Sequence, residues 1–241
     1  VWLARRRAHL IGMPPDCWLD LGLWGVLGGL AGARVLFVIQ HWPDYSPLGP
    51  QGLGALARAA AIWEGGLVYF GAVAAVIPLT IIYCRVKKLP ALKVLDLAAP
   101  SLVAGQALGR LGCFMRGCCF GKPSGLPWAV NFRPEGEAYL AYLQAGQIGR
   151  DAPCSPPLHP AQLYASVSAA LTAAFLYAYW PRRGRDGQVL ALMLALCGVT
   201  RFFEEFLRAD VEAALPALSP SLTFAQYFSL ILIAAGALLK K

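Results

Sequence analysis

Apolar residues gather in six long runs, and the stretches between them carry most of the charged residues. The runs cover about 17–39, 62–84, 94–115, 158–180, 188–207 and 221–239, and the third and fifth are the least apolar. Each approaches the length of about 20 helical residues that crosses a hydrocarbon core of about 30 Å. The pattern therefore predicts an all-α fold, a polytopic membrane helix bundle with six spans in this chain.

The longest connection between runs, at about 116–157, predicts a small head segment outside the membrane. Within it, the alternation at 126–132 predicts a short strand, and the pattern at 135–147 predicts a short amphipathic helix. We expect residues 1–241 to form a single transmembrane domain. The head segment, inserted between two spans, is then expected to form a lid over the outer mouth of the bundle.

Lysine and arginine clusters mark one side of the membrane. They precede the first run, separate the second from the third and the fourth from the fifth, and end the chain. Because short cytoplasmic loops retain Lys and Arg preferentially, we place these clusters in the cytoplasm and about 40–61, 116–157 and 208–220 in the periplasm or cell exterior. This arrangement predicts a multi-pass membrane protein. The residues around Arg5 resemble the last turn of a helix, so we expect a seventh span before Val1.

Composition agrees with a membrane protein, since 58% of the residues are hydrophobic and only 14% are charged. Soluble domains carry markedly more charge. The net charge of +8 is explained by the cytoplasmic clusters, which favour an anionic inner leaflet. The basic residues do not form one patch interleaved with aromatic residues, so we expect no nucleic-acid partner.

Several ionisable residues fall within the apolar runs, where each requires a partner, a wet cavity or a function. They include Arg34, Glu64, Arg110, Arg201, Glu204 and Glu205. Arg201 and Glu205 are four residues apart and share a helix face, with Arg208 one turn further along. For Arg110 and Arg201 we favour an external anion such as phosphate, which suits the planar donor fork of guanidinium. For Arg34, Glu204 and Arg208, ion pairs between helices or at the interface are an equal alternative.

Glycines recur at close helical spacing in "GVLGGLAGAR", "EGGLVYFGA" and "GQALGRLG". Small residues allow helix backbones to approach each other, so most of these glycines predict tight packing. Gly121 differs because it sits where Pro123 forces the helix to break. We expect free backbone N–H groups around Gly121 to face a ligand.

Six motifs, "GARVLFVI", "WEGGLVYFG", "APSLVAGQALGRLGCFMRGCCFGKP", "PLHPAQLYAS", "GVTRFFEEFLRAD" and "LTFAQYFSLILIAAG", follow one another along the chain. In order and spacing, the chain resembles the prolipoprotein diacylglyceryl transferase family over essentially its whole length. The resemblance implies a transferase of the bacterial inner membrane, with its active site towards the periplasmic side. This enzyme moves the diacylglyceryl group of phosphatidylglycerol to the lipobox cysteine of a prolipoprotein, as a thioether, and releases glycerol phosphate. The implied partners are phosphatidylglycerol, the prolipoprotein signal-peptide helix and membrane lipid, and no cofactor is implied.

The resemblance also assigns roles to individual residues. We place Arg201, Glu205, Tyr69 and His159 in the catalytic set, and Arg110, Gly121, Arg34, Arg208, Gln162 and Tyr164 in the set that binds phosphatidylglycerol. Arg110 matches the arginine of the family signature and is expected to stabilise the leaving phosphate. Arg201 is expected to be the second contact to the anion, with Glu205 orienting it. Gln226 and Ser229 match a pair in the family's last helix.

The chain departs from the family pattern where a histidine is proposed to activate the thiol, because Phe70 stands there. Tyr69 is a hydrogen-bonding substitute, but tyrosine titrates near 10. Cys113, Cys118 and Ala165 replace an asparagine, an acidic residue and a glutamate of the family. Two alternatives stay open: a transferase with a different thiol acceptor, and a non-catalytic phospholipid-binding membrane paralogue. A channel or transporter is less favoured, because the buried charges gather towards the exterior half.

Four of the seven cysteines lie in or near the signature and the "HPAQLY" box. In an oxidising exterior compartment, Cys154 can form a disulfide with Cys118 or Cys119, and inert buried thiols are the alternative. A metal site made of Cys118, Cys119, Cys154 and His159 matches no standard zinc spacing, so we assign no metal. A catalytic thiol is the remaining hypothesis.

Overall fold

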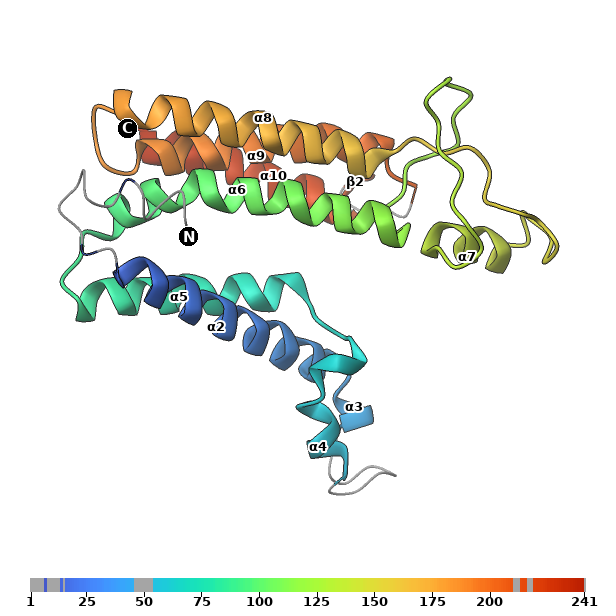
Figure 1. The fold of residues 1–241 in the computed structure, drawn as a ribbon, viewed down its shortest axis with the longest axis horizontal. Helices are drawn as coiled ribbons and strands as arrows, with labels where there is room; N and C mark the ends of the chain where they lie inside the picture. The colour runs from blue at the N-terminus through green and yellow to red at the C-terminus, as the bar shows by residue number, and fades with distance from the viewer. Residues whose placement is uncertain are drawn as a thin grey trace. The chain divides into compact units, whose positions relative to one another are not determined.

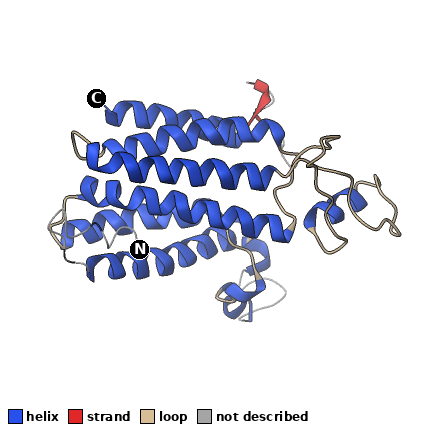
Figure 2. Cartoon of the chain, turned by 45° about the horizontal axis from the view of Figure 1, so that its top comes forward, coloured by secondary structure: helices blue, strands red, loops and turns tan. Residues whose placement is uncertain are grey.

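The computed structural model describes residues 7, 14, 16–45, 54–209, 213–215 and 219–240. Helices dominate this part of the chain (Figure 2). The long ones are α2 (Asp16–Gln40), α5 (Tyr69–Val86), α6 (Ala91–Arg116), α8 (Ala161–Tyr179), α9 (Gln188–Leu207) and α10 (Phe224–Lys240). Shorter elements are α3 (Trp42–Tyr45), α4 (Gly54–Ala59), η2 (Ile62–Glu64), α7 (Glu137–Gln144) and η3 (Trp180–Arg182). Each of the six apolar runs contains one long helix.

Among the described residues, three helical stretches are long and apolar enough to cross a membrane: α2, α6 and Ala161–Arg182, which joins α8 to η3. The apolar parts of α5 and α10 are shorter, at Gly71–Val86 and Phe224–Leu239. Helix α9 has 20 residues but carries three charged side chains near its end. Large apolar side chains such as Leu23, Leu171 and Phe203 are exposed on these helices, which suits contact with lipid tails. The chain is thus a membrane protein, and the number of spans stays a prediction.

Two compact units make up the chain, residues 1–94 and 95–241, with the boundary in the first turn of α6. In the first unit, α2 and α5 pack along each other (Figure 1). The packing is close because Gly32 lies against Gly71: a Cβ atom on Gly32 would meet the Gly71 carbonyl oxygen at 2.5 Å. The predicted packing role of glycine is confirmed at this contact.

In the second unit, α9 lies between α8 and α10 and packs most extensively against α10 (Figure 1). A Cβ atom on Gly198 of α9 would meet the Ser229 carbonyl oxygen of α10 at 2.7 Å. Helix α6 is tied to α8 by the Ser166 hydroxyl, which donates to the Ala107 carbonyl oxygen at 2.9 Å. This unit contains most of the residues that the sequence places in the site.

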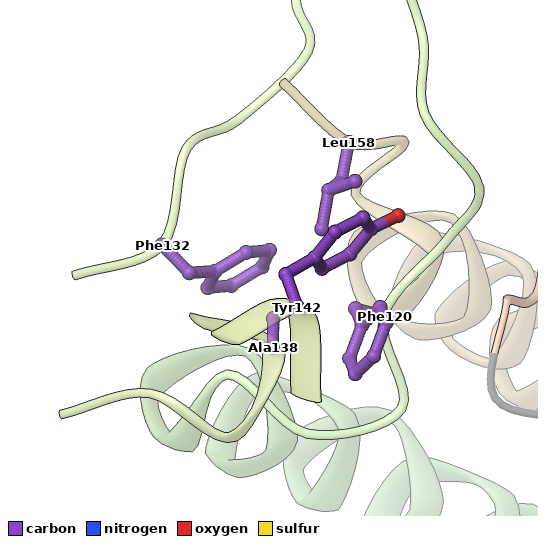
Figure 3. Packing of buried hydrophobic residues seen from close by; sticks show 5 residues of the cluster. All are labelled: Phe120, Phe132, Ala138, Tyr142 and Leu158. Carbon is purple, nitrogen blue, oxygen red and sulfur yellow. The ribbon is translucent and has the colours of Figure 1, made fainter. Parts of the chain in front are cut away.

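The head segment lies beyond the C-terminal end of α6 and the start of α8 and has an apolar core of its own (Figures 2 and 3). In that core the Tyr142 ring of α7 lies among the side chains of Phe120, Phe132 and Leu158, all of them buried. The predicted helix at 135–147 is confirmed as α7. Phe114 of α6 packs against this core, with its ring centroid 5.8 Å from that of Phe132, so the apolar contacts also join the head segment to the end of α6.

The strand predicted at 126–132 is wrong. Residues there form turns and irregular backbone, and only Val130 makes an isolated bridge, with Leu158. Alternation alone does not make a strand, because the backbone also needs a neighbouring strand along its length. The strands that do form, β1 (Ala213–Leu215) and β2 (Ser219–Thr223), are an antiparallel pair before α10 that the apolar pattern did not predict.

Asp96 connects α6 to the start of α9 and is fully buried, with 0% of the residue exposed. Its two carboxylate oxygens accept hydrogen bonds from the amides of Gly187 and Leu190, each at 2.8 Å. Arg183 lies 3.9 Å from the same carboxylate. The first amides of a helix have no partner within the helix and carry partial positive charge. Asp96 therefore caps α9 from a different helix.

We expect Asp96→Ala to lower stability by about 2 kcal/mol, because it leaves buried amides and Arg183 without their acceptor. The measurement is the apparent melting temperature of the detergent-solubilised protein. Glu135→Ala, which removes an exposed carboxylate of the head segment, is the matched control and is expected to leave the melting temperature unchanged. Equal melting temperatures for both variants would contradict the capping role.

Candidate functional site

Arg201 and Glu205 form an ion pair in the last turns of α9, with 2.6 Å between Nη2 and Oε2. Glu205 is buried, at 4% exposed, and its other oxygen accepts a hydrogen bond from the Thr223 hydroxyl at 2.8 Å. The side chain of Arg201 is 23% exposed. The predicted pairing is confirmed, and Glu205 holds the guanidinium in place while leaving part of it open.

Thr223 is itself held by a reciprocal contact with Gln226 at the start of α10. The Gln226 side-chain oxygen accepts from the Thr223 amide at 2.9 Å, and the Thr223 hydroxyl accepts from the Gln226 amide at 3.3 Å. This is the capping box of a helix N-terminus. Sequence analysis missed Thr223, although the Thr-x-x-Gln spacing before an apolar run signals such a box. The box orients the hydroxyl that supports Glu205.

Two further arginines act on Arg201 through their charges. Arg110, half-buried near the end of α6, and Arg208 both lie close enough to repel the Arg201 guanidinium. Glu204 also acts on Arg201 and accepts a hydrogen bond from the Ser168 hydroxyl at 2.7 Å. The three arginines, Arg110, Arg201 and Arg208, carry one more charge than the carboxylates of Glu204 and Glu205. The group therefore has a net positive charge.

Arg110 differs from the other arginines of this group in its contacts. Across the part of the chain that the structure describes, no carboxylate lies within ion-pair distance of Arg110, and no hydrogen bond involves its side chain. A half-buried guanidinium in a membrane helix requires an anionic or polar partner. Arg110 and the open part of Arg201 are therefore suited to an anion such as a phosphate, which accepts several charge-assisted hydrogen bonds.

Gly121 lies where the head segment meets the start of α8 and the end of α9. Its amide donates to the His159 carbonyl oxygen at 3.1 Å, and the next amide, of Lys122, donates to the Leu207 carbonyl oxygen at 2.8 Å. Gly121 also forms a bridge with Arg208. The expectation of free N–H groups around Gly121 is thus wrong, because the backbone pairs with neighbouring segments as an extended chain. Its role as a lipid contact stays a prediction.

The residues of the "HPAQLY" box tie the first turn of α8 to the head segment. Gln162, at 1% exposed, donates from Nε2 to the Cys118 carbonyl oxygen at 2.7 Å. Tyr164 accepts a hydrogen bond from Trp128 Nε1 at 2.7 Å and lies 3.4 Å from His159 Nδ1. The structure therefore brings His159, Gln162 and Tyr164 together, and Trp128 is a neighbour that sequence analysis did not single out.

An open groove of about 550 Å³ runs along α8 from Tyr164 to Leu171. Its wall is almost entirely apolar and includes Trp128 and Val167. Such a surface suits a hydrocarbon chain. Ser168, one of the residues that line the groove, donates a hydrogen bond to Glu204.

Arg34 belongs to the first unit, where it is buried at 5% exposed. Its guanidinium donates to the carbonyl oxygens of Arg58 at 2.7 Å, Ala59 at 2.8 Å and Gly66 at 3.2 Å, and also to that of Gly65. These contacts hold the segment that leads into α5. They give Arg34 a structural role, and its contact with a phospholipid stays a prediction.

Tyr69, the remaining predicted residue, is the first residue of α5. Its side chain and that of Phe70 lie outside the residues whose side chains the structure describes. The proposed catalytic role of Tyr69 therefore stays a prediction from the sequence.

Three cysteines gather at the end of α6. The sulfur atoms of Cys113, Cys118 and Cys119 all lie within 4.8 Å of one another, and Cys154 does not belong to the group. All seven cysteines are free, so the disulfide between Cys154 and Cys118 or Cys119 is not formed. Burial and the neighbouring thiols raise the pKa of Cys118 to about 12. Cys118 thus stays protonated at neutral pH, which counts against an activated catalytic thiol at this position.

Comparison with known proteins shows the family of the chain. Residues 1–240 match the family model of prolipoprotein diacylglyceryl transferase. The chain belongs to this family. It is a transferase by family, as the motifs in the sequence had implied.

Curated relatives are similar over nearly the whole chain. The phosphatidylglycerol–prolipoprotein diacylglyceryl transferase of Clostridium tetani is 32% identical over 98% of this chain and 84% of its own length. The proteins of the same name from Acaryochloris marina and Bordetella parapertussis are 32% and 31% identical over 98% of this chain, and over 78% and 82% of their own lengths. This member of the prolipoprotein diacylglyceryl transferase family thus matches its relatives across both units.

We expect Gly121→Ala to destabilise this transferase by about 2 kcal/mol or more, because its Cβ atom would meet the His159 carbonyl oxygen at 2.5 Å. The matched control is Gly125→Ala, whose Cβ atom would meet nothing within 4 Å. Melting temperatures in detergent check both variants. A stable Gly121→Ala protein would show that the close approach to His159 is not required.

Proposed function

We propose that this protein transfers the diacylglyceryl group of phosphatidylglycerol to the lipobox cysteine of a prolipoprotein, at the periplasmic side of the bacterial inner membrane. The observation that carries the proposal concerns Arg110, which has no ion-pair or hydrogen-bond partner among the described residues and acts by its charge on Arg201, which Glu205 holds in place. The names of the curated relatives, which specify both substrates, support it. The basic clusters that predict the cytoplasmic side support the orientation.

In the proposed reaction, the thiolate of the acceptor cysteine attacks the glyceryl carbon that carries the phosphate ester. A carbon–sulfur bond forms, the carbon–oxygen bond breaks, and its electron pair leaves with the oxygen of glycerol phosphate. Negative charge therefore grows on the phosphate in the transition state. Arg110 and Arg201 stabilise this charge, because preorganised donors aimed at developing charge lower the barrier.

Glu205 acts through Arg201. The ion pair and the hydrogen bond from Thr223 keep the guanidinium oriented without substrate, so binding the phosphate requires little rearrangement. The apolar groove on α8 supports the choice of a lipid donor. Its apolar wall suits an acyl chain of phosphatidylglycerol, and Ser168, which lines the groove, donates to Glu204, a carboxylate that acts by charge on Arg201.

The acceptor thiol must lose a proton before it attacks. We assign this step to His159, since imidazole is the side chain that most often serves as a general base. The contact between His159 Nδ1 and the Tyr164 hydroxyl at 3.4 Å supports a defined ring position. Phe70, which stands where the family histidine is expected, cannot move a proton.

We expect Arg110→Ala to reduce transfer by about 100-fold, because the mutation removes a donor to the leaving phosphate. The assay incubates the purified full-length protein with phosphatidylglycerol and a lipobox peptide and follows the mass gain of one diacylglyceryl group. Arg133→Ala, which removes an exposed arginine of the head segment, is the control and should retain full activity.

If the wild-type protein binds phosphatidylglycerol and no peptide gains mass, the proposed transfer is wrong. That outcome would favour the non-catalytic phospholipid-binding alternative, which Phe70 already supports. Mass gain on a small thiol but not on the peptide would instead favour a different thiol acceptor.

We expect Glu205→Gln to lower kcat by about tenfold, because the amide keeps a hydrogen bond to Thr223 but no longer holds Arg201 by charge. Thr223→Val should act in the same direction with a smaller effect. Initial rates at several phosphatidylglycerol concentrations separate kcat from KM, and melting temperatures confirm folding. Wild-type kinetics in a folded Glu205→Gln protein would contradict the positioning role.

A further inference from the structure

The end of α6 has the geometry of a Schellman turn. The Gly117 amide donates to the Phe114 carbonyl oxygen at 3.1 Å, and the Cys118 amide donates to the Cys113 carbonyl oxygen at 3.1 Å. Gly117 adopts the left-handed conformation, with φ of 74°. In this turn the side chain after the glycine normally contacts the side chain five residues earlier. Here both of these side chains are cysteines, Cys118 and Cys113.

Cys119 joins the pair because its backbone also turns left-handed, with φ of 56°. This conformation is uncommon for a residue with a Cβ atom and has an energetic cost. Gln162 stabilises the turn by donating to the Cys118 carbonyl oxygen at 2.7 Å. The three sulfur atoms consequently lie within 4.8 Å of one another on a half-exposed turn.

The sulfur positions suit a metal ion. Three thiolates at a metal–sulfur distance of about 2.3 Å are about 3.8 Å apart in a tetrahedral site, so small side-chain rotations from the observed positions suffice. Soft thiolate ligands select soft cations such as Cu(I) and Zn(II) over hard ones. The Cys118 thiol donates to the Cys113 carbonyl oxygen, with 3.7 Å between sulfur and oxygen, and this contact is given up when the thiol loses its proton to bind a metal.

We propose that Cys113, Cys118 and Cys119 form a three-thiolate site for one soft metal cation, Cu(I) or Zn(II). Binding replaces three thiol protons with the cation and requires no oxidant or reductant. The affinity therefore rises with pH. The inference stands apart from the transfer reaction, since it depends only on the turn at the end of α6.

The test titrates the full-length protein in detergent, under reducing conditions, with Cd²⁺, whose thiolate complexes absorb in the ultraviolet. We expect one equivalent to bind and to protect Cys113, Cys118 and Cys119 from alkylation by N-ethylmaleimide, as mapped by mass spectrometry. This footprint uses the wild-type protein and needs no variant. Absence of a one-to-one complex, or protection of other cysteines instead, would overturn the proposal.

Variants test the ligand set. Cys118→Ser should weaken Cd²⁺ binding at least tenfold and the triple serine variant should abolish it, while the matched control Cys154→Ser should bind as the wild type does. Equal binding by the folded triple variant would refute the site. Competition with chelators selective for Cu(I) and for Zn(II) then shows which ion binds more tightly, and failure of both ions to bind would also refute it.

Discussion

The backbone of Gly121 passes so close to His159 that an added Cβ atom would meet the carbonyl oxygen at 2.5 Å. That approach lets residues 121–122 pair with the chain before α8 and with the end of α9. This pairing holds together the residues around Gly121, the chain before α8 that contains His159, and the end of α9, which carries Arg201. Gly121 thus contributes to the site because it has no side chain and permits this close approach. Its amide is not available to a ligand, since it donates to the His159 carbonyl oxygen.

The distribution of charge around Arg201 favours the binding of an anion. Glu205 is satisfied by Arg201 and Thr223, and Glu204 by Ser168. Arg110 has no such partner among the described residues and adds to the positive charge that Arg201 experiences. An excess of positive charge at membrane depth is costly alone and favourable with an anion. In the proposed function, the phosphate of a phospholipid is that anion.

The chain departs from the family pattern at Phe70, where a residue that transfers a proton is expected, and in the turn at the end of α6. Arg110 and Arg201 match the pattern. Phe70 removes a titratable group, whereas the cysteines at 113, 118 and 119 bring soft ligands into a turn that brings their sulfur atoms together. Gln162 connects the cysteine turn to the first turn of α8.

The positions of the long helices followed from the sequence alone, because a continuous apolar run of membrane-spanning length leaves the backbone little alternative to a helix. The Arg201–Glu205 pair followed from helical spacing for the same reason. Tertiary structure decided the partners of Gly121, the structural contacts of Arg34 and the grouping of the cysteines. Each of these depends on segments far apart in sequence or on a left-handed turn, and local periodicity contains neither.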